Sequence, residues 1–125
     1  MNEESNESGS AVHQVNNCLI ASFNRHSDET SISRTGKVLL KQLAKNRAKG
    51  VIIDLSDVTI LSSNEFAILK NVARSVAMMG TTPVFSGFQP GVAASLVDLD
   101  TGFDDIMTAR NIDDAVELLA KLMLD

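Results

Sequence analysis

The sequence predicts one α/β domain with a mostly parallel or mixed central sheet of about four or five strands and about four helices. Two observations lead to this fold class. Short apolar runs typical of strands alternate with longer segments of helical periodicity, and parallel neighbouring strands require such crossover helices. In addition, 125 residues with 44% hydrophobic content suit one compact core and leave little room for a second.

The first ten residues differ in composition from the rest of the chain. Residues 1–10 combine Asn, Glu, Ser and Gly and contain no apolar residue after Met1. Such a segment has nothing to bury. We therefore expect a disordered acidic tail at residues 1–10 and a folded domain at residues 11–125.

The first part of the domain is expected to hold two strands and a helix. In order, the segments are an edge strand at 12–15, a strand at 18–23, a polar loop at 25–30 and a helix at about 33–47. Within this helix Thr35, Leu39 and Leu43 recur at the spacing of a core-facing stripe. Gly36 interrupts the helical pattern, and Gly50 follows the helix as a stop signal.

The middle of the chain carries the pattern around which the other elements are arranged. Residues 51–55 form a nearly continuous apolar run, as expected of a strand buried on both faces. An amphipathic helix follows and ends at Gly80. Ser62 and Glu65 predict a capping box at its start, in which the serine oxygen accepts from a backbone N–H and the glutamate reaches back. Ser63 would be the first helical residue, with its hydroxyl facing solvent.

The last third of the domain is expected to contain two short strands and two helices. They are a strand at 82–86, a helix opened by Pro90, a strand at 104–108 and a helix capped by Asn111. The first of these helices is expected to run through Val92, Ala93, Leu96 and Val97. The buried stripe of the second is expected to consist of Ile112, Ala115, Val116, Leu119 and Leu122.

The composition argues against several classes of function. A net charge of −5 disfavours nucleic acid as a partner, because phosphates require a positive surface. One cysteine, Cys18, and two histidines, His13 and His26, provide neither a disulfide nor a cluster with metal-ligand spacing. No apolar run reaches the roughly 20 residues of a membrane span. We therefore expect a cytoplasmic protein with no metal or cofactor, and with neither membrane nor nucleic acid as a partner.

Positive charge is nonetheless concentrated in the first helix. Six basic residues and no acidic one lie between Arg34 and Lys49, and Lys37, Lys41 and Lys45 follow one another at four-residue steps. Two interpretations are open. These lysines are either a solvated helix face or a docking surface for an acidic patch on another subunit.

No enzymatic site is evident. A phosphate-binding loop would need several glycines at a strand-to-helix turn, which neither candidate turn has. The nucleophile elbow of α/β-hydrolases needs a glycine two residues to either side of the serine, and neither Ser63 nor Ser86 has them. Neither His13 nor His26 lies near these serines in sequence. A small hydrolase that uses Ser63 or Ser86 is kept as an alternative to a non-enzymatic protein.

Ser63 is the polar residue that most suggests regulation. A phosphate at a helix start gains from the helix dipole and from backbone N–H groups, and it adds about 1.5 to 2 negative charges to the surface. Serine is also common at helix starts for structural reasons. The residues alone therefore leave both a switch and a structural role open.

Four segments, in their order and spacing, resemble a known family. They are Asn17-Cys-Leu-Ile-Ala-Ser, Gly50-Val-Ile-Ile-Asp-Leu, Asn71-Val-Ala-Arg and, most specifically, Gly87-Phe-Gln-Pro-Gly-Val-Ala. The family is STAS, named after sulphate transporters and anti-sigma-factor antagonists. The resemblance runs from about Val12 to Leu124, and within the family it is strongest to the RsbS-type branch.

The resemblance implies a non-enzymatic regulatory scaffold. Proteins of the RsbS-type branch co-assemble with RsbR-type paralogues into a large shell, the stressosome. The shell holds a switch serine/threonine kinase of the RsbT type, which phosphorylates the scaffold under stress and then leaves. The first alternative is an ordinary anti-sigma-factor antagonist that binds its partner in a small complex.

The resemblance also implies the site residues. The phosphoacceptor falls on Ser63, and a secondary acceptor falls on Ser86. The family usually has Asp before the acceptor and apolar residues after it, whereas this chain has Ser62 before it and Asn64 and Glu65 after it. Ser62 therefore becomes a competing acceptor. Asn64, Glu65 and the three lysines are the residues expected to contact a partner.

Overall fold

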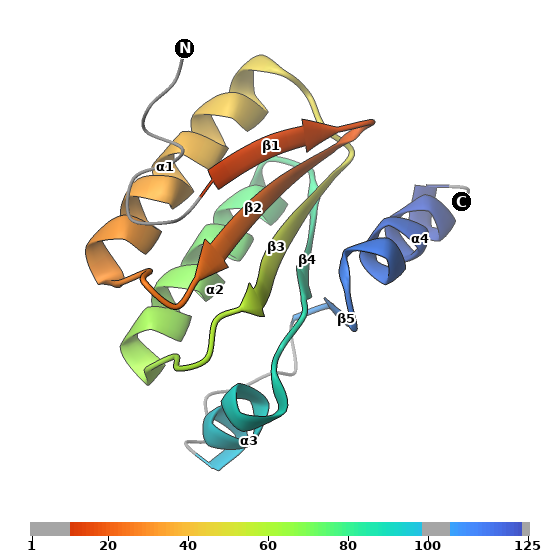
Figure 1. The fold of residues 1–125 in the computed structure, drawn as a ribbon. Coiled ribbons are helices and arrows are strands. Elements are labelled where there is room, and N and C mark those ends of the chain that lie inside the picture. The colour runs from red at the N-terminus through yellow and green to blue at the C-terminus, as the bar shows by residue number, and fades with distance from the viewer. Residues whose placement is uncertain (1–10, 99–105, 124–125) are drawn as a thin grey trace.

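A computed structural model of the chain describes residues 11–98 and 106–123. Within these residues it contains five strands and four helices (Figure 1), which confirms the fold class. The elements are β1 (Ala11–Val15), β2 (Cys18–Asn24), α1 (Glu29–Lys45), β3 (Gly50–Asp57), α2 (Ser63–Met78), β4 (Thr82–Ser86), α3 (Pro90–Asp98), β5 (Thr108–Ala109) and α4 (Ile112–Met123). The tail expected at residues 1–10 lies outside the described residues.

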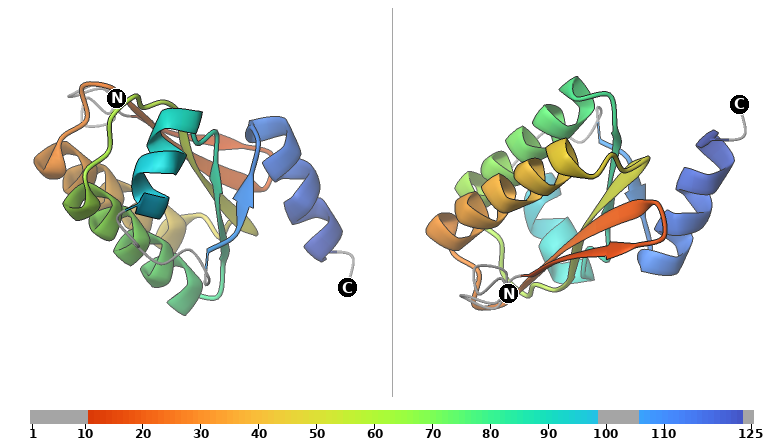
Figure 2. Two further views of the ribbon diagram at one scale, coloured as in Figure 1. Left: turned by 90° about the horizontal axis from the view of Figure 1, so that it is seen from below. Right: turned by 90° about the horizontal axis from the view of Figure 1, so that it is seen from above.

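The sheet is mixed, and its strand order follows the chain. The order is β1-β2-β3-β4-β5, with β1 antiparallel to β2 and every other neighbouring pair parallel. Helices α1 and α2 cover one face of the sheet and α4 lies against the other (Figure 2). Helix α3 lies beyond the carboxyl ends of the strands (Figure 1).

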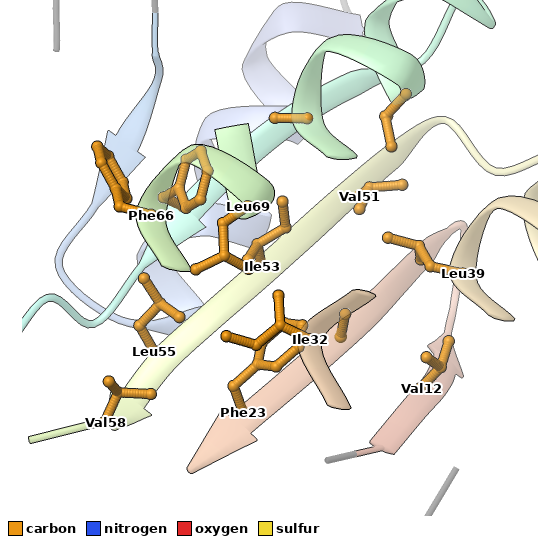
Figure 3. Packing of buried hydrophobic residues seen from close by; sticks show 14 of the residues in the cluster. Val12, Phe23, Ile32, Leu39, Val51, Ile53, Leu55, Val58, Phe66 and Leu69 are labelled. Atoms are coloured by element: carbon orange, nitrogen blue, oxygen red, sulfur yellow. The ribbon is translucent and has the colours of Figure 1, made fainter. Parts of the chain in front are cut away.

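The core is divided by the sheet into two clusters of unequal size. The larger cluster lies under α1 and α2 and includes Phe23, Ile32 and Leu69 (Figure 3). The smaller one lies under α4 and includes Ile52 and Leu119. Strand β3 contributes to both clusters, and its residues 50–55 are all buried. Because burial of one large aliphatic side chain contributes about 1.5–3 kcal/mol, β3 anchors both layers.

Helix α1 begins four residues earlier than the pattern predicted. The last two residues of the loop expected at 25–30 belong to the helix. Asp28, also within that segment, caps the helix by accepting a hydrogen bond from the Ser31 backbone N–H at 2.8 Å. The expected core-facing residues of this helix are buried. The helix also explains Gly36, because a Cβ there would lie 2.7 Å from Cγ2 of Val72 on α2. The glycine lets the two helices approach closely.

In the last third of the domain, the final strand is shorter than expected and fewer helical residues are buried. Strand β5 consists of Thr108 and Ala109 only, whereas part of the predicted 104–108 strand lies outside the described residues. Leu122 is 43% exposed, so its predicted burial was wrong. The buried residues of α4, Ala115 and Leu119, form a narrow strip against the sheet, so Leu122 at the side of that strip remains exposed.

The prediction of the final helix start was confirmed. Asn111 caps α4, because its side-chain oxygen accepts from the backbone N–H of Asp114 at 2.8 Å. Ala115 and Leu119 are buried against the sheet.

Candidate functional site

The start of α2 is a complete capping box, as the sequence predicted. The Ser62 hydroxyl oxygen accepts from the Glu65 backbone N–H at 3.1 Å, and the Ser62 backbone N–H donates to the Glu65 carboxylate at 2.9 Å. Ser63 is the first helical residue, and it is exposed. The hydroxyl of Ser62 is therefore engaged in the cap, whereas the cap makes no use of the Ser63 hydroxyl.

Three aromatic rings hold this helix start against the sheet. Phe66 is fully buried, and its ring centroid lies 6.0 Å from that of Phe85 on β4 and 6.1 Å from that of Phe88. The Lys70 ammonium lies 5.5 Å from the centroid of the Phe66 ring. Aromatic contacts of this kind stabilise by about 0.5–1.5 kcal/mol beyond the area that they bury. The serine pair is thus carried on a rigid support.

The Gly87-Phe-Gln-Pro segment connects that support to the end of β3. Gly87 has a φ of 78°, and a Cβ on it would lie 2.8 Å from the Cβ of Ser56. The Gln89 side-chain amide donates to the Ser56 carbonyl oxygen at 2.6 Å. Pro90 then opens α3. The most specific segment of the resemblance is therefore a loop that clamps the carboxyl end of β3, next to the loop that leads to Ser62.

Asp54 is a buried polar residue that the sequence analysis did not single out. Its carboxylate accepts from the Ser56 hydroxyl at 2.7 Å and from the Ser86 hydroxyl at 2.8 Å. It is only 6% exposed. The signal for it was an acid inside the apolar run at 51–55, but its partner on β4 lies 32 residues away. Asp54 joins β3 to β4 beneath the clamping loop.

Ser86 is completely buried, with no exposed surface. Its hydroxyl donates to Asp54, and neither histidine takes part in that contact. His13 on β1 and His26 are both exposed. The folded domain therefore presents Ser63 to a macromolecule and encloses Ser86.

The other predicted contact residues divide between two surfaces. Asn64 is exposed and Glu65 half-buried beside Ser63 at the start of α2. Lys37, Lys41 and Lys45, which we call the lysine ridge, are all exposed along the outer side of α1. The residues from Ser62 to Glu65 thus form one surface at the start of α2, whereas the lysine ridge lies on a separate element, α1.

The described part of the chain holds no group of three or more His, Cys, Asp or Glu residues that could bind a metal ion. In the same residues, no helix combines the length and the apolar character needed to cross a bilayer. Cys18 is buried, and desolvation raises the pKa of its thiol.

The fold and the site define a class: a single α/β domain in which an exposed serine at a helix start lies beside a clamping loop at the carboxyl ends of parallel strands. The chain belongs to the STAS-domain family, whose family model matches residues 10–118.

Solved structures with the same fold include a stressosome chain and an anti-sigma factor antagonist. The chain is similar to RsbS from Moorella thermoacetica, with a TM-score of 0.81 and 21% identity over 93% of this chain and 98% of that one. A chain in a structure of the stressosome, described as a signal integration and transduction hub, gives a TM-score of 0.76 and 22% identity over 90% and 97%. The unphosphorylated anti-sigma factor antagonist SpoIIAA gives a TM-score of 0.69 and 10% identity over 90% of this chain and 96% of that one.

Proposed function

We propose that this chain is a non-enzymatic scaffold of a stressosome-type complex, which acts in the cytoplasm together with RsbR-type paralogues. It retains an RsbT-type switch kinase and releases it when Ser63 is phosphorylated. The observation that carries the proposal is that the two serines at the start of α2 have different roles: the Ser62 hydroxyl makes the cap, and Ser63 is exposed beside it. Similarity to RsbS and to a stressosome chain supports the choice of assembly.

Phosphorylation of Ser63 would change the surface more than the fold. The phosphate would sit at the positive end of the α2 dipole, which favours negative charge. It would also add about 1.5 to 2 negative charges close to the Glu65 carboxylate. Because Glu65 is held in the capping box, its carboxylate cannot move away from the phosphate without breaking the cap. The kinase therefore meets a rigid surface whose charge has changed sharply.

The competing serines are less suitable acceptors. Transfer to Ser62 requires breaking the hydrogen bond that its oxygen makes with Glu65, which removes about 1 kcal/mol of helix stability. Transfer to Ser86 requires opening the clamping loop, because the hydroxyl is buried against Asp54. Ser63 requires neither change.

Mass spectrometry of the chain after treatment with an RsbT-type kinase tests the assignment. We expect phosphate on Ser63. The variant Ser63→Ala should keep the kinase bound under activating conditions, and Ser63→Asp should bind it poorly. Ser62→Ala is the matched control, since it should lower stability and leave release intact. Phosphate on Ser62, or only on Ser86, would overturn both the acceptor and the switch.

Similarity to SpoIIAA favours a second candidate, a simple anti-sigma-factor antagonist that works in a small complex. Size-exclusion chromatography of the chain mixed with an RsbR-type paralogue separates the two functions. The scaffold requires a very large assembly. Elution as a small complex, with Ser63 still the acceptor, would favour the antagonist.

A further inference from the structure

The charge of the molecule is unevenly distributed between the layers. The chain between Arg34 and Lys49 and the part of α2 after Glu65 together contain eight basic residues and no acidic one. Since the net charge is −5, the rest of the chain carries thirteen net negative charges. The basic segments form the layer on one face of the sheet, whereas α4 lies on the other face (Figure 2). Helix α4 carries Asp113, Asp114 and Glu117 against one basic residue, Lys121, so the two faces of the molecule differ in charge.

The lysine ridge has no acidic neighbour within its own helix. None of its three members has Asp or Glu three or four residues away on either side, and successive members lie four residues apart. Like charges at this spacing repel and destabilise a helix slightly. The ridge points opposite to the buried residues Leu39 and Leu43, and therefore directly away from the core. These lysines are placed to meet an external acidic surface.

Helix α4 carries a matching surface, which we call the acidic ridge. Asp113 and Glu117 are exposed, lie four residues apart and point away from the buried Ala115 and Leu119. The exposed Lys121 stands at the next four-residue step, so the acidic ridge consists of these two carboxylates in the first half of the helix. Asp114, beside them, pairs with Arg110 at 3.2 Å. Residues four apart on any α-helix are separated by about 6 Å along the axis. Carboxylates on α4 and ammonium groups on α1 therefore repeat at the same interval.

We propose that the lysine ridge of one copy docks on the acidic ridge of a second copy. Because the two ridges lie on opposite faces of the sheet, the contact is heterologous: each copy still offers one ridge of each kind after docking. The contact therefore propagates from copy to copy instead of closing as a symmetric pair. This inference deepens the proposed scaffold function, since it names the surfaces through which copies associate.

Sedimentation velocity of the isolated chain, at low and at high salt, measures this association without any kinase. Changing the three members of the lysine ridge to Glu should weaken it roughly tenfold or more. Changing Asp113 and Glu117 to Lys should weaken it similarly. Salt should weaken association of the parent chain, because exposed charges are screened. Circular dichroism confirms that each variant is folded.

Mixing the two reversed variants provides the decisive control. Each variant alone carries two ridges of like sign, but in the mixture every ridge again meets its opposite. Association should therefore return in the mixture and be lost again at high salt. A mixture that remains monomeric, or a Lys-to-Glu variant that associates like the parent, would overturn the proposal.

Two further measurements distinguish this proposal from an alternative partner for the lysine ridge and from the proposed function. The acidic residues 1–10 could occupy the lysine ridge instead, so the same measurements are made on a chain that lacks residues 2–10. If the lysine changes no longer matter there, the tail is the partner and the proposal is wrong. Kinase capture is assayed independently on the Ser63 variants. If the parent chain and Ser63→Ala both fail to capture the kinase while ridge-dependent association is intact, the proposed function is rejected and the interface stands.

Discussion

The starts of α1 and α2 are built on the same plan but carry their charged side chains at different positions. Each has a capping box, and the residues at the cap and at the first, third and fourth helical positions are Asp28, Glu29, Ser31 and Ile32 in α1 and Ser62, Ser63, Glu65 and Phe66 in α2. The first position thus holds a permanent carboxylate in α1 and a neutral hydroxyl in α2. Phosphorylation of Ser63 would place at the first position of α2 the negative charge that Glu29 supplies at the first position of α1, so only α2 can change its charge there.

The largest effect is expected from the buried residue at the fourth position. Phe66→Ala should lower the free energy of unfolding by about 3–5 kcal/mol, because it removes the ring that Phe85 and Phe88 enclose. Ile32→Ala, at the equivalent place in α1, should lower it by about 2–5 kcal/mol. Urea denaturation measures both. A negligible loss for Phe66→Ala would show that the aromatic cluster does not support the helix start.

The α2 cap should contribute less. Ser62→Ala should lower the free energy of unfolding by about 1 kcal/mol, because the Glu65 backbone N–H loses its acceptor. Ser62→Asp restores an acceptor and serves as the matched control, so its stability should return towards that of the parent. If Ser62→Ala and Ser62→Asp unfold alike, the cap is not the source of the difference.

The α1 cap should differ from the α2 cap in its response to pH. Backbone and side-chain hydrogen bonds with Ser31 hold the pKa of the Asp28 carboxyl below its usual value of 3.8. A carboxyl with a lowered pKa stabilises the folded state above the unfolded pKa, and this contribution is lost as pH falls through the folded pKa. Thermal unfolding of Asp28→Ala should therefore differ from that of the parent at neutral pH and converge with it in acid. A difference that is unchanged at low pH would contradict this origin.

Exchange of charge at the first helical position should have a smaller effect on stability. Ser63→Asp places a carboxylate at the positive end of the α2 dipole and should stabilise by about 0.3–1 kcal/mol. Glu29→Ser should lose a similar amount in α1. Chemical denaturation of both variants checks the symmetry. Opposite signs are expected, and destabilisation by both changes would show that Glu65 repulsion outweighs the dipole in α2.

Deletion of residues 2–10 should have the smallest effect. They contain no apolar side chain, so their removal should leave the melting temperature within experimental error. A clear decrease would show that the helix starts and the core depend on the tail.

Local patterns were sufficient for α2 and insufficient for α1. A serine followed by glutamate three residues later is a recognised capping box, whereas Asp28 with Ser31 lacks the glutamate and lies in a polar stretch that reads as a loop. The support of the site depends on contacts between distant residues. The bond from Ser86 to Asp54 spans 32 residues and becomes apparent only once β3 and β4 are paired. Sequence patterns therefore located Ser63 but not the contacts that support the helix start on which it lies.

The shortness of β5 has a consequence for solubility. Within the described residues β5 pairs only with Phe85 and Ser86, so the first half of β4 has no neighbour on that side. Phe85 donates its N–H towards β5, and alternate residues of a strand donate to the same side, so the nitrogen of Pro83 faces the open edge. Proline has no hydrogen to donate there, and a foreign strand could not complete a ladder along it. Pro83 thus disfavours aggregation by addition of a strand at this edge.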